Sequence, residues 1–262
     1  GGGDMGALPN KLPGFQDVED DVARKKFNQK WNCVIPPTNG WNLTQMFEAM
    51  ERKELRAVFV IGENPAQSEA DGAHATHLLE NLDFLVVQDL FLTKTAQLAD
   101  VVFPGSASWC ESDGTVTNSE RRVQRVRKAI NSPGNARDDI QIILDLAREM
   151  GHDWKYESSE QIWDELRSLS PMHAGMSYKR LAELGGIQWP CFSEDTLEPS
   201  FLHGRLWDKY TAKRGRLAPF SVVVDEPPVE ATSPEFPLRL TTGRRLDSYN
   251  TGVQTRGFDS PL

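Results

Sequence analysis

The sequence predicts an α/β fold built on a doubly wound, Rossmann-like parallel sheet, and three observations support this class. Short apolar runs at 56–61, 84–89 and 100–104 are typical of buried parallel strands. Segments of helical length at 71–81 and 93–99 separate these runs, so strands and helices alternate along the chain. The chain has 262 residues with 7 Trp and 12 Phe, which is enough to bury a sizeable core in one or two domains.

Composition excludes several classes of protein. The 38 acidic and 29 basic residues give a net charge of -9, so we expect no nucleic-acid partner and no general attraction to anionic lipid. No apolar run approaches the roughly 20 residues of a membrane span, so we expect no direct span. Cys33, Cys110 and Cys191 are few and far apart, which argues against a disulfide framework and a Cys-x-x-Cys metal site. We expect them to be buried, reduced thiols.

The loops after the predicted strands have the chemistry of a nucleotide site. Gly62 permits close backbone approach, and Asn64 can both donate and accept hydrogen bonds. Asp89 can accept hydrogen bonds from ribose hydroxyls or from guanine N–H groups, and Thr93 and Thr95 fit a helix N-terminus that meets a phosphate. One such loop alone would more often be a plain turn or cap. Three such loops, at 62–65, 88–95 and 104–111, lie at one sheet edge and together favour a nucleotide site. The absence of Gly-x-Gly-x-x-Gly disfavours an ordinary NAD site.

A basic run follows in this acidic chain. Five basic residues occupy the eight positions 121–128. The run is either a solvated face of a strand or helix, or an electropositive lining for an anionic cofactor or cluster. Composition does not choose between these readings.

The remaining chain is less regular. Amphipathic helices are predicted at 138–151 and 159–169. The stretch 185–237 reads as an irregular connector rich in Pro and aromatic residues, with one strand at 217–224. Residues 236–244 read as a strand that enters a Gly turn and begins a further domain.

Seven motifs in a fixed order carry a family resemblance. They are Asp4–Pro9, Gly62–Pro65, Val87–Asp89, Ala99–Pro104, Asp113–Gln124, Gly186–Cys191 and Thr241–Arg244. In this order they resemble the molybdopterin oxidoreductases, and most closely the catalytic alpha subunits of formate dehydrogenases. The resemblance runs nearly from end to end of the chain.

The resemblance implies a molybdenum or tungsten bis-molybdopterin guanine dinucleotide, together with a 4Fe-4S cluster whose ligands lie outside this chain. It implies oxidation of formate to CO2, with electrons passed to iron-sulfur or flavin subunits, and we expect a cytoplasmic location. The implied domains are 1–150, which binds the guanine dinucleotide, a connector at 151–235, and the start of a β-barrel domain at 236–262.

The resemblance also implies a set of cofactor contacts at loop and helix ends. These are Gly62, Glu63, Asn64, Gln88, Asp89, Thr93, Asp100, Asp139, Thr242, Gly243 and Arg244. The basic run near Arg122 and Arg125 would lie toward the cluster-bearing domain.

The family's metal ligand, its neighbouring His and Arg, and the cluster cysteines all precede the motif at Asp4. We therefore expect no catalytic or metal-binding residue here, and we expect the chain to be an internal fragment that is inactive alone. Three alternatives stay open: a nitrate reductase catalytic subunit, a non-catalytic relative such as the large iron-sulfur subunit of NADH dehydrogenase, and a simple nucleotide-binding module.

Overall fold

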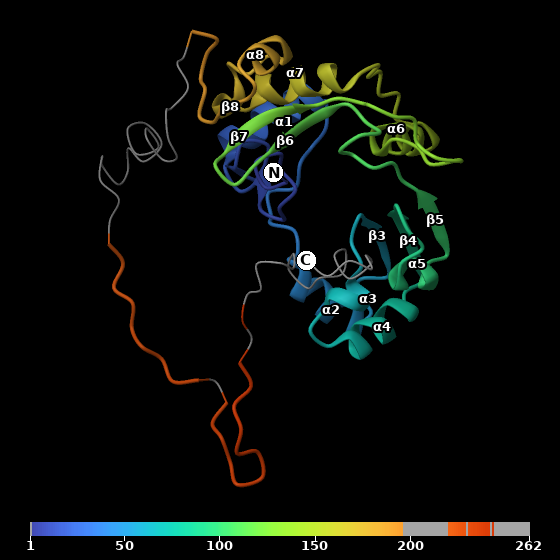
Figure 1. The fold of residues 1–262 in the computed structure, drawn as a ribbon, viewed down its shortest axis with the longest axis vertical. Helices are drawn as coiled ribbons and strands as arrows, with labels where there is room; N and C mark the ends of the chain where they lie inside the picture. Colours follow the sequence, from blue (N-terminus) through green and yellow to red (C-terminus); the bar gives the residue numbers. More distant parts are fainter. Residues whose placement is uncertain (1, 196–219, 229, 242, 244–262) are drawn as a thin grey trace. The chain divides into compact units, whose positions relative to one another are not determined.

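The computed structural model describes residues 2–195, 220–228, 230–241 and 243 (Figure 1). The chain divides into two compact units, residues 1–206 and 207–262, which are described separately. The first unit contains all the helices and strands among the described residues. None of these helices is long and apolar enough to cross a membrane.

A three-stranded parallel sheet confirms the three predicted strands. It consists of β3 (Ala57–Ile61), β4 (Phe84–Asp89) and β5 (Val101–Pro104) in the order β3-β4-β5. Strand order follows chain order, so the sheet grows in one direction only. The reversal of direction that defines a doubly wound sheet is not among the described strands. The register pairs Ile61 with Gln88 and Asp89 with Pro104, so the carboxyl ends of the strands meet at one edge.

The crossovers between these strands are helical, as predicted. After β3 the chain forms α3 (Pro65–Ser68) and α4 (Gly72–Glu80), and after β4 it forms α5 (Lys94–Leu98). Asp71 accepts a hydrogen bond from the backbone N–H of His74 and caps α4. The helix α2 (Leu43–Glu51) precedes the sheet and begins with a capping box formed by Asn42 and Gln45.

The core of this region is apolar and tightly enclosed. Leu85 is 1% exposed and Val87 is 0% exposed. They pack with Leu79 of α4, Met50 of α2 and Ala96 of α5, so the helices cover the sheet through these contacts. Burial of this kind is the main stabilising contribution to the fold.

A second sheet is antiparallel and was not predicted as a sheet. Its strands are β6 (Gly114–Thr117), β7 (Arg122–Val126) and β8 (Ile187–Gln188), in the order β6-β7-β8. The expectation that the chain is irregular from residue 185 is therefore wrong at β8, which is fully buried. Two alternating residues of β8 were too short a pattern to mark a strand.

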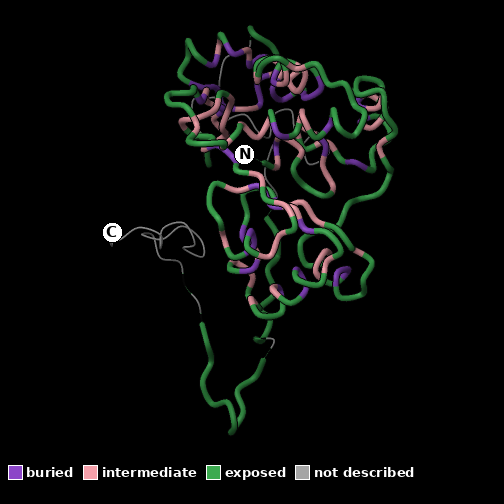
Figure 2. Tube along the Cα trace, turned by 90° about the vertical axis from the view of Figure 1, so that its right-hand side faces the viewer, coloured by how far each residue is buried: buried purple, intermediate pink, exposed green. Residues whose placement is uncertain are grey.

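Residues 159–183 pack on this second sheet. They form α7 (Ser159–Leu169), the 3-10 helix η1 (Pro171–His173) and α8 (Tyr178–Glu183). Trp163, Leu181 and Ile187 share one core with Val123 of β7. Figure 2 shows buried positions in the strands and helices of this unit. The helix predicted at 159–169 is confirmed.

Three further elements complete the first unit. The N-terminal segment forms the hairpin β1 (Lys11–Leu12) and β2 (Gln16–Asp17), followed by α1 (Asp21–Trp31). In sequence, α6 (Asp139–Glu149) lies between β7 and β8, and it confirms the helix predicted at 138–151.

The described residues of the second unit contain no helix or strand. The strands predicted at 217–224 and 236–244 are therefore wrong over 220–224 and 236–241. Phe220, Val222 and Leu238 are 104%, 93% and 88% exposed, so these apolar runs have neither a covering core nor a partner strand among the described residues (Figure 2). Backbone groups in a strand need a partner for their hydrogen bonds.

Candidate functional site

The carboxyl edge of the parallel sheet opens with Gly62. Its φ is +64°, a left-handed conformation that favours glycine, and its N–H donates to the carbonyl of Gln88 at 2.9 Å. No heavy atom lies within 4 Å of the position that a Cβ would take. The backbone here can therefore be approached closely by a ligand. The neighbouring Glu63 is exposed.

Asn64 holds the loop after β3 to the start of α5. Its Oδ1 accepts from the backbone N–H of Thr95 at 3.1 Å and from the Thr95 hydroxyl at 2.8 Å. The same hydroxyl oxygen accepts from Ala66 N at 3.1 Å. Asn64 is 8% exposed and Thr95 is 0% exposed. Both side chains thus make hydrogen bonds within the protein, and these bonds hold the loop after β3 in place at the edge.

Thr93 is the N-cap of α5, because its hydroxyl accepts from Ala96 N at 3.1 Å. Asp89 also shapes its own loop: its carboxylate accepts from Phe91 N at 3.1 Å and its carbonyl accepts from Gly105 N at 3.0 Å. These bonds fix the turn from β4 into α5 and join the end of β4 to the residue after β5.

Gln88 and Asp139 form a buried polar pair at this edge. Gln88 Nε2 donates to Asp139 Oδ1 at 2.6 Å, which joins the end of β4 to the first turn of α6. Gln88 is 1% exposed, and its Oε1 has no hydrogen-bond donor among the described residues. Burial raises the pKa of Asp139, and Asp138 raises it further, while the bond from Gln88 opposes this.

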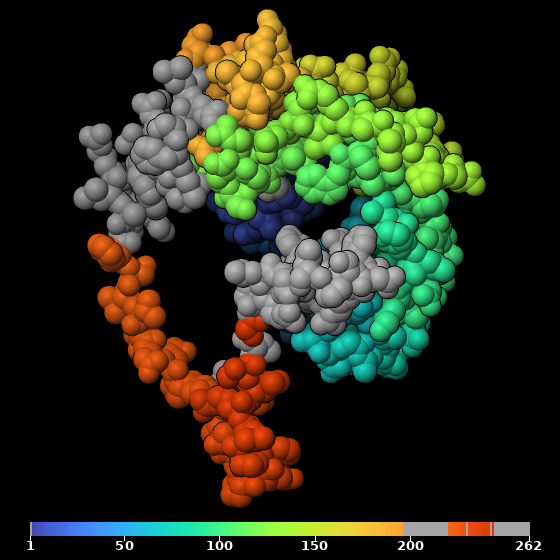
Figure 3. All heavy atoms as spheres, viewed as in Figure 1, coloured from blue at the N-terminus to red at the C-terminus, as the bar shows by residue number. Residues whose placement is uncertain are grey.

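Gly105 keeps a space open beside this pair. A Cβ at Gly105 would lie 3.2 Å from Asp139 Oδ1 and 3.7 Å from Gln88 Cγ. Backbone bonds from Ser106 N to Arg137 O at 2.9 Å and from Arg137 N to Pro104 O at 3.0 Å bring α6 to the end of β5. The chain is continuous in the space-filling view from the sheet into the segment that leads to α6 (Figure 3). Gly105 lies in the predicted loop 104–111 but was not among the predicted cofactor contacts, although a Gly directly after a predicted strand is the same signal as Gly62.

Asp100 does not lie at this edge. It precedes β5 at the amino end of the strand, and its Oδ2 accepts from Leu85 N at 2.7 Å. At about 3.3 Å per residue, the length of β5 separates it from the loops at the carboxyl edge. Of the C-terminal residues, Gly243 belongs to the second unit, while Thr242 and Arg244 lie outside the described residues.

The structure thus brings together one subset of the predicted site. The residues at the carboxyl edge are Gly62, Glu63, Asn64, Gln88, Asp89, Thr93 and Asp139. Within this subset, Asn64 and Thr93 support the loops. Gln88 and Asp139 are the polar groups with hydrogen-bonding capacity toward a ligand.

Most of the basic run lies in strand β7. The hypothesis of a solvated face is right for only part of the run, because its first residue is buried and its last two are exposed. Arg121 is 7% exposed, and the guanidinium carbon of Arg125 lies 3.3 Å from the ring centroid of Tyr178. Arg127 and Lys128 are exposed.

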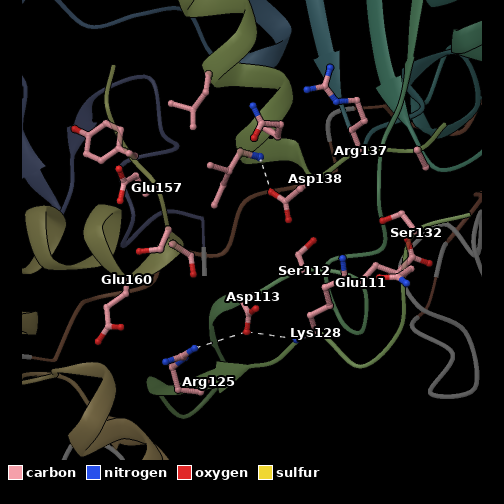
Figure 4. A pocket seen from close by; sticks show the side chains of 18 of the residues that line it. Glu111, Ser112, Asp113, Arg125, Lys128, Ser132, Arg137, Asp138, Glu157 and Glu160 are labelled. Atoms are coloured by element: carbon pink, nitrogen blue, oxygen red, sulfur yellow. Dashed lines mark hydrogen bonds and ion pairs between the residues drawn. The ribbon is translucent and has the colours of Figure 1, made fainter. Parts of the chain in front are cut away.

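A cavity of about 760 Å³ lies beside the start of α6 (Figure 4). Its charged lining is mixed: Asp113 faces Arg125 with Oδ1 to Nη2 at 3.8 Å, and Glu157 and Glu160 lie across from Lys128. A lining of both signs does not select an anion or a cation. Asp139 lines a smaller, mostly apolar cavity of about 350 Å³ together with Trp163 and Ile140.

The described part of the chain contains no cluster of metal-ligating side chains, and its cysteines are unpaired. No group of three or more His, Cys, Asp or Glu side chains is placed there to hold a metal ion. The expectation of buried thiols is right for Cys191 and wrong for Cys33, which is exposed, while Cys110 is half-buried. Cys33 follows α1 directly, where the helix ends at its left-handed C-cap Asn32 and the chain turns out of the core.

The edge fits the guanine end of a dinucleotide. Guanine presents the N1–H and N2–H donors side by side, and such donors need acceptors of the kind that Asp139 and Gln88 Oε1 provide. Gly62 and Gly105 leave room for a planar base or a phosphate to approach the backbone. The fit rests on the buried acceptor of Gln88, which the described protein leaves without a donor.

Comparison with known proteins finds formate dehydrogenase subunits among the relatives of this chain. The chain is 44% identical over 255 residues to the F420-dependent formate dehydrogenase subunit alpha of Methanocaldococcus jannaschii, covering 97% of this chain and 37% of that protein. It is 36% identical over 254 residues to formate dehydrogenase H of Escherichia coli, covering 96% of this chain and 35% of that protein. The chain thus spans little more than a third of the length of these relatives.

Among solved structures, acetylene hydratase from Pelobacter acetylenicus is similar, with a TM-score of 0.48 and 22% identity over 78% of this chain and 30% of that chain. The family model described as molybdopterin oxidoreductase matches residues 3–149, which is more than half of the 262 residues. The chain therefore belongs to the molybdopterin oxidoreductase family.

Proposed function

We propose that the carboxyl edge of the parallel sheet binds the guanine end of a molybdopterin guanine dinucleotide, in the catalytic subunit of a formate dehydrogenase. The observation that carries this proposal is the buried Gln88–Asp139 pair, with its short bond of 2.6 Å and the undonated Gln88 Oε1. A buried acceptor without a donor is costly, so a ligand that supplies N–H groups would stabilise it.

Each residue at the edge has a distinct part in the proposal. Asp139 accepts from guanine, and Gln88 holds the Asp139 carboxylate in place through Nε2 while its Oε1 faces a ligand donor. Gly62 and Gly105 let the nucleotide approach the backbone. Asn64 and Thr95 hold the loop that carries Gly62. Asp100 is left out of this proposal because its carboxylate caps the opposite end of the sheet.

At the level of the whole protein, we propose oxidation of formate to CO2, which releases one proton and two electrons. The metal of the bis-molybdopterin guanine dinucleotide, molybdenum or tungsten, would supply the two-electron chemistry when bound. A 4Fe-4S cluster ligated outside this chain would pass the electrons to iron-sulfur or flavin subunits. The names of the relatives support formate over nitrate as the substrate. A cytoplasmic location stays a prediction.

The test of the cofactor site is Asp139→Asn in the full-length subunit that contains this chain. Asn keeps the shape and one acceptor for Gln88, but it places an amide where guanine needs a second acceptor. We expect the guanine nucleotide released from the denatured protein to fall at least about 10-fold, the equivalent of a lost charge-assisted hydrogen bond. Glu149→Gln, exposed at the end of the same helix, is the matched control and should keep the full content.

Wild-type nucleotide content in a folded Asp139→Asn subunit would refute the site. The substrate is tested separately, by assaying the loaded full-length subunit with formate plus a dye acceptor and with nitrate plus a reduced dye. Turnover of nitrate but not formate would overturn the proposed activity. Formate oxidation by residues 1–262 alone would overturn the view that the catalytic ligands lie outside this chain.

A further inference from the structure

The turn between β6 and β7 carries a buried cation with no hydrogen-bond or ion-pair partner among the described residues. Arg121 is 7% exposed, and its Nε, Nη1 and Nη2 atoms have no hydrogen-bond acceptor among the described residues. Burial lowers the pKa of its guanidinium, as expected for a charge withdrawn from water without compensation. A buried charge is seldom kept in a protein unless it is paired.

A second donor lies beside it. The guanidinium carbon of Arg121 is 5.0 Å from the ring centroid of Trp189, and the Trp189 Nε1 is also buried without an acceptor among the described residues. Trp189 N donates to Arg121 O at 3.0 Å, and the β7–β8 pairing sets Arg122 opposite Gln188. The two donors are therefore held together by the backbone of the sheet.

The backbone at Arg121 is also fixed in an uncommon conformation. Its φ is +68°, which a non-glycine residue adopts at a cost. Asn118 fixes the turn, since its Oδ1 accepts from Glu120 N at 3.0 Å and from Arg122 N at 2.9 Å. The turn thus directs Arg121 inward, while its neighbour Arg122 pairs with Glu120.

The carboxylates that contact this hairpin are engaged elsewhere. Glu120 Oε1 accepts from Arg122 Nε at 2.9 Å, and its Oε2 accepts from Gln188 Nε2 at 3.3 Å. Asp4 Oδ2 accepts from the hydroxyl of Thr117 at 2.9 Å. A water molecule could fill one donor of the guanidinium, but it would not balance the charge.

We propose that Arg121 and Trp189 form a binding site for an oxyanion that the described residues do not supply. A planar guanidinium beside an indole N–H matches a carboxylate or a phosphate, because both present several acceptor oxygens to a fork of donors. The oxyanion comes either from a carboxylate of another part of the full-length subunit or from a phosphate of the cofactor. The second source rests on the proposed function, and the first does not.

The test compares the full-length subunit made with the cofactor and in a host that does not make the pterin. Arg121→Met removes the charge and keeps an apolar chain of similar length, and exposed Arg127→Met is the matched control. The readouts are the thermal midpoint Tm of each form and the guanine nucleotide content of the loaded form. A lost paired charge should lower Tm by roughly 2 °C or more.

The pattern of these readouts identifies the source. With a protein carboxylate, Arg121→Met lowers Tm in both forms and leaves the nucleotide content unchanged. With a cofactor phosphate, it lowers Tm and nucleotide content in the loaded form only. An unchanged or raised Tm in both forms, with full nucleotide content, would overturn the proposal, since replacing an unpaired buried charge by an apolar side chain is neutral or stabilising.

Trp189→Phe is the second variant, because it removes the Nε1 donor and keeps a ring for stacking. We expect it to shift the same readout, in the same form of the subunit, by a smaller amount than Arg121→Met. If Arg121→Met does not accumulate as folded protein, Trp189→Phe decides: a lowered Tm or nucleotide content supports the oxyanion, and wild-type values for both overturn it. Because the Tm without cofactor is independent of guanine binding, this result is distinct from failure of the Asp139 test.

Discussion

The two larger sheets of this chain differ in how they treat buried polar groups. Around the parallel sheet, Asn64 and Thr95 satisfy each other, and the one undonated acceptor, Gln88 Oε1, lies at the ligand edge. Around the antiparallel sheet, the guanidinium of Arg121 and the Nε1 of Trp189 are buried without an acceptor in the described part of the chain. The unsatisfied group of the first region is thus an acceptor at the proposed ligand edge, whereas these two groups of the second region are donors, one of them charged.

The apolar cores of the two regions should be equally well packed. Truncating a buried leucine in either core is therefore the change with the largest expected effect on stability. Leu85 in β4 of the parallel sheet and Leu181 in α8, which packs on the antiparallel sheet, are each 1% exposed. Leu85→Ala and Leu181→Ala should each lower the free energy of unfolding by about 2–5 kcal/mol, through lost burial and the cavity left behind. Denaturant unfolding of the full-length subunit measures both.

Leu43→Ala is the matched control, because Leu43 is 53% exposed at the start of α2. Its cost should stay within about 0.5 kcal/mol. A cost for Leu181→Ala as small as that control would break the comparison, because the antiparallel region would then lack a packed core as well as polar partners.

Thr95→Val addresses the polar pairing of the parallel region and has a smaller expected effect. Val keeps the shape but removes the hydroxyl that donates to Asn64 at 2.8 Å and accepts from Ala66 N at 3.1 Å. The buried Ala66 N–H would be left unsatisfied, which should cost about 1–3 kcal/mol in the free energy of unfolding.

Thr76→Val on α4 is the control, since that hydroxyl donates only to the carbonyl of Gly72 one turn earlier. A similar small loss for both variants would mean that the Asn64–Thr95 pairing contributes nothing beyond an ordinary side-chain bond. A loss confined to Thr95→Val would support the view that this region satisfies its own polar groups.

The parallel half of the fold was predictable from sequence because its signals are local. The apolar runs of β3 and β4 are continuous, and Asp71 and Thr93 mark the starts of α4 and α5. The antiparallel sheet was not predictable in the same way. β8 has two residues, and it exists because it pairs with β7, more than sixty positions earlier in the chain.

The candidate site was predictable only in part, for a related reason. Strand ends placed Gly62 and Gln88 at one edge, but no local pattern shows that Gln88 bonds to Asp139 in a helix fifty-one positions later. Asp100 stands at the head of β5 as predicted, but this is the amino end of the strand, so grouping it with the contacts at the carboxyl edge was wrong. The burial of Arg121 was equally hidden, since a basic run in sequence usually indicates a solvated surface.

The smallest expected effect is a pH dependence of stability at the ligand edge. There the parallel region, like the antiparallel one, has a buried polar atom without a partner among the described residues. Burial raises the pKa of Asp139, so the folded protein holds this proton more tightly than the unfolded chain does. The resulting stabilisation is complete below the ordinary pKa of 3.8 and is lost as pH rises through the raised value. Asp139→Asn cannot lose it, so the Tm of the cofactor-free variant minus that of wild type should increase as pH rises from about 4 to 7.

Asp145→Asn on the same helix gives a control of opposite sign. Hydrogen bonding from Arg137 lowers the pKa of Asp145, so wild type gains stability from that carboxylate above its ordinary pKa of 3.8 and loses it as pH falls through the lowered value. The Tm of this variant minus that of wild type should therefore decrease only as pH rises through the lowered value toward 3.8, and it should stay level above that pH. The decrease should be slight, because the pair is at the surface. If the Tm difference of Asp139→Asn falls with rising pH, as that of Asp145→Asn does, Asp139 is not a buried carboxyl that lacks a donor. The buried polar groups of the ligand edge would then be satisfied within the protein, like those of the rest of its sheet.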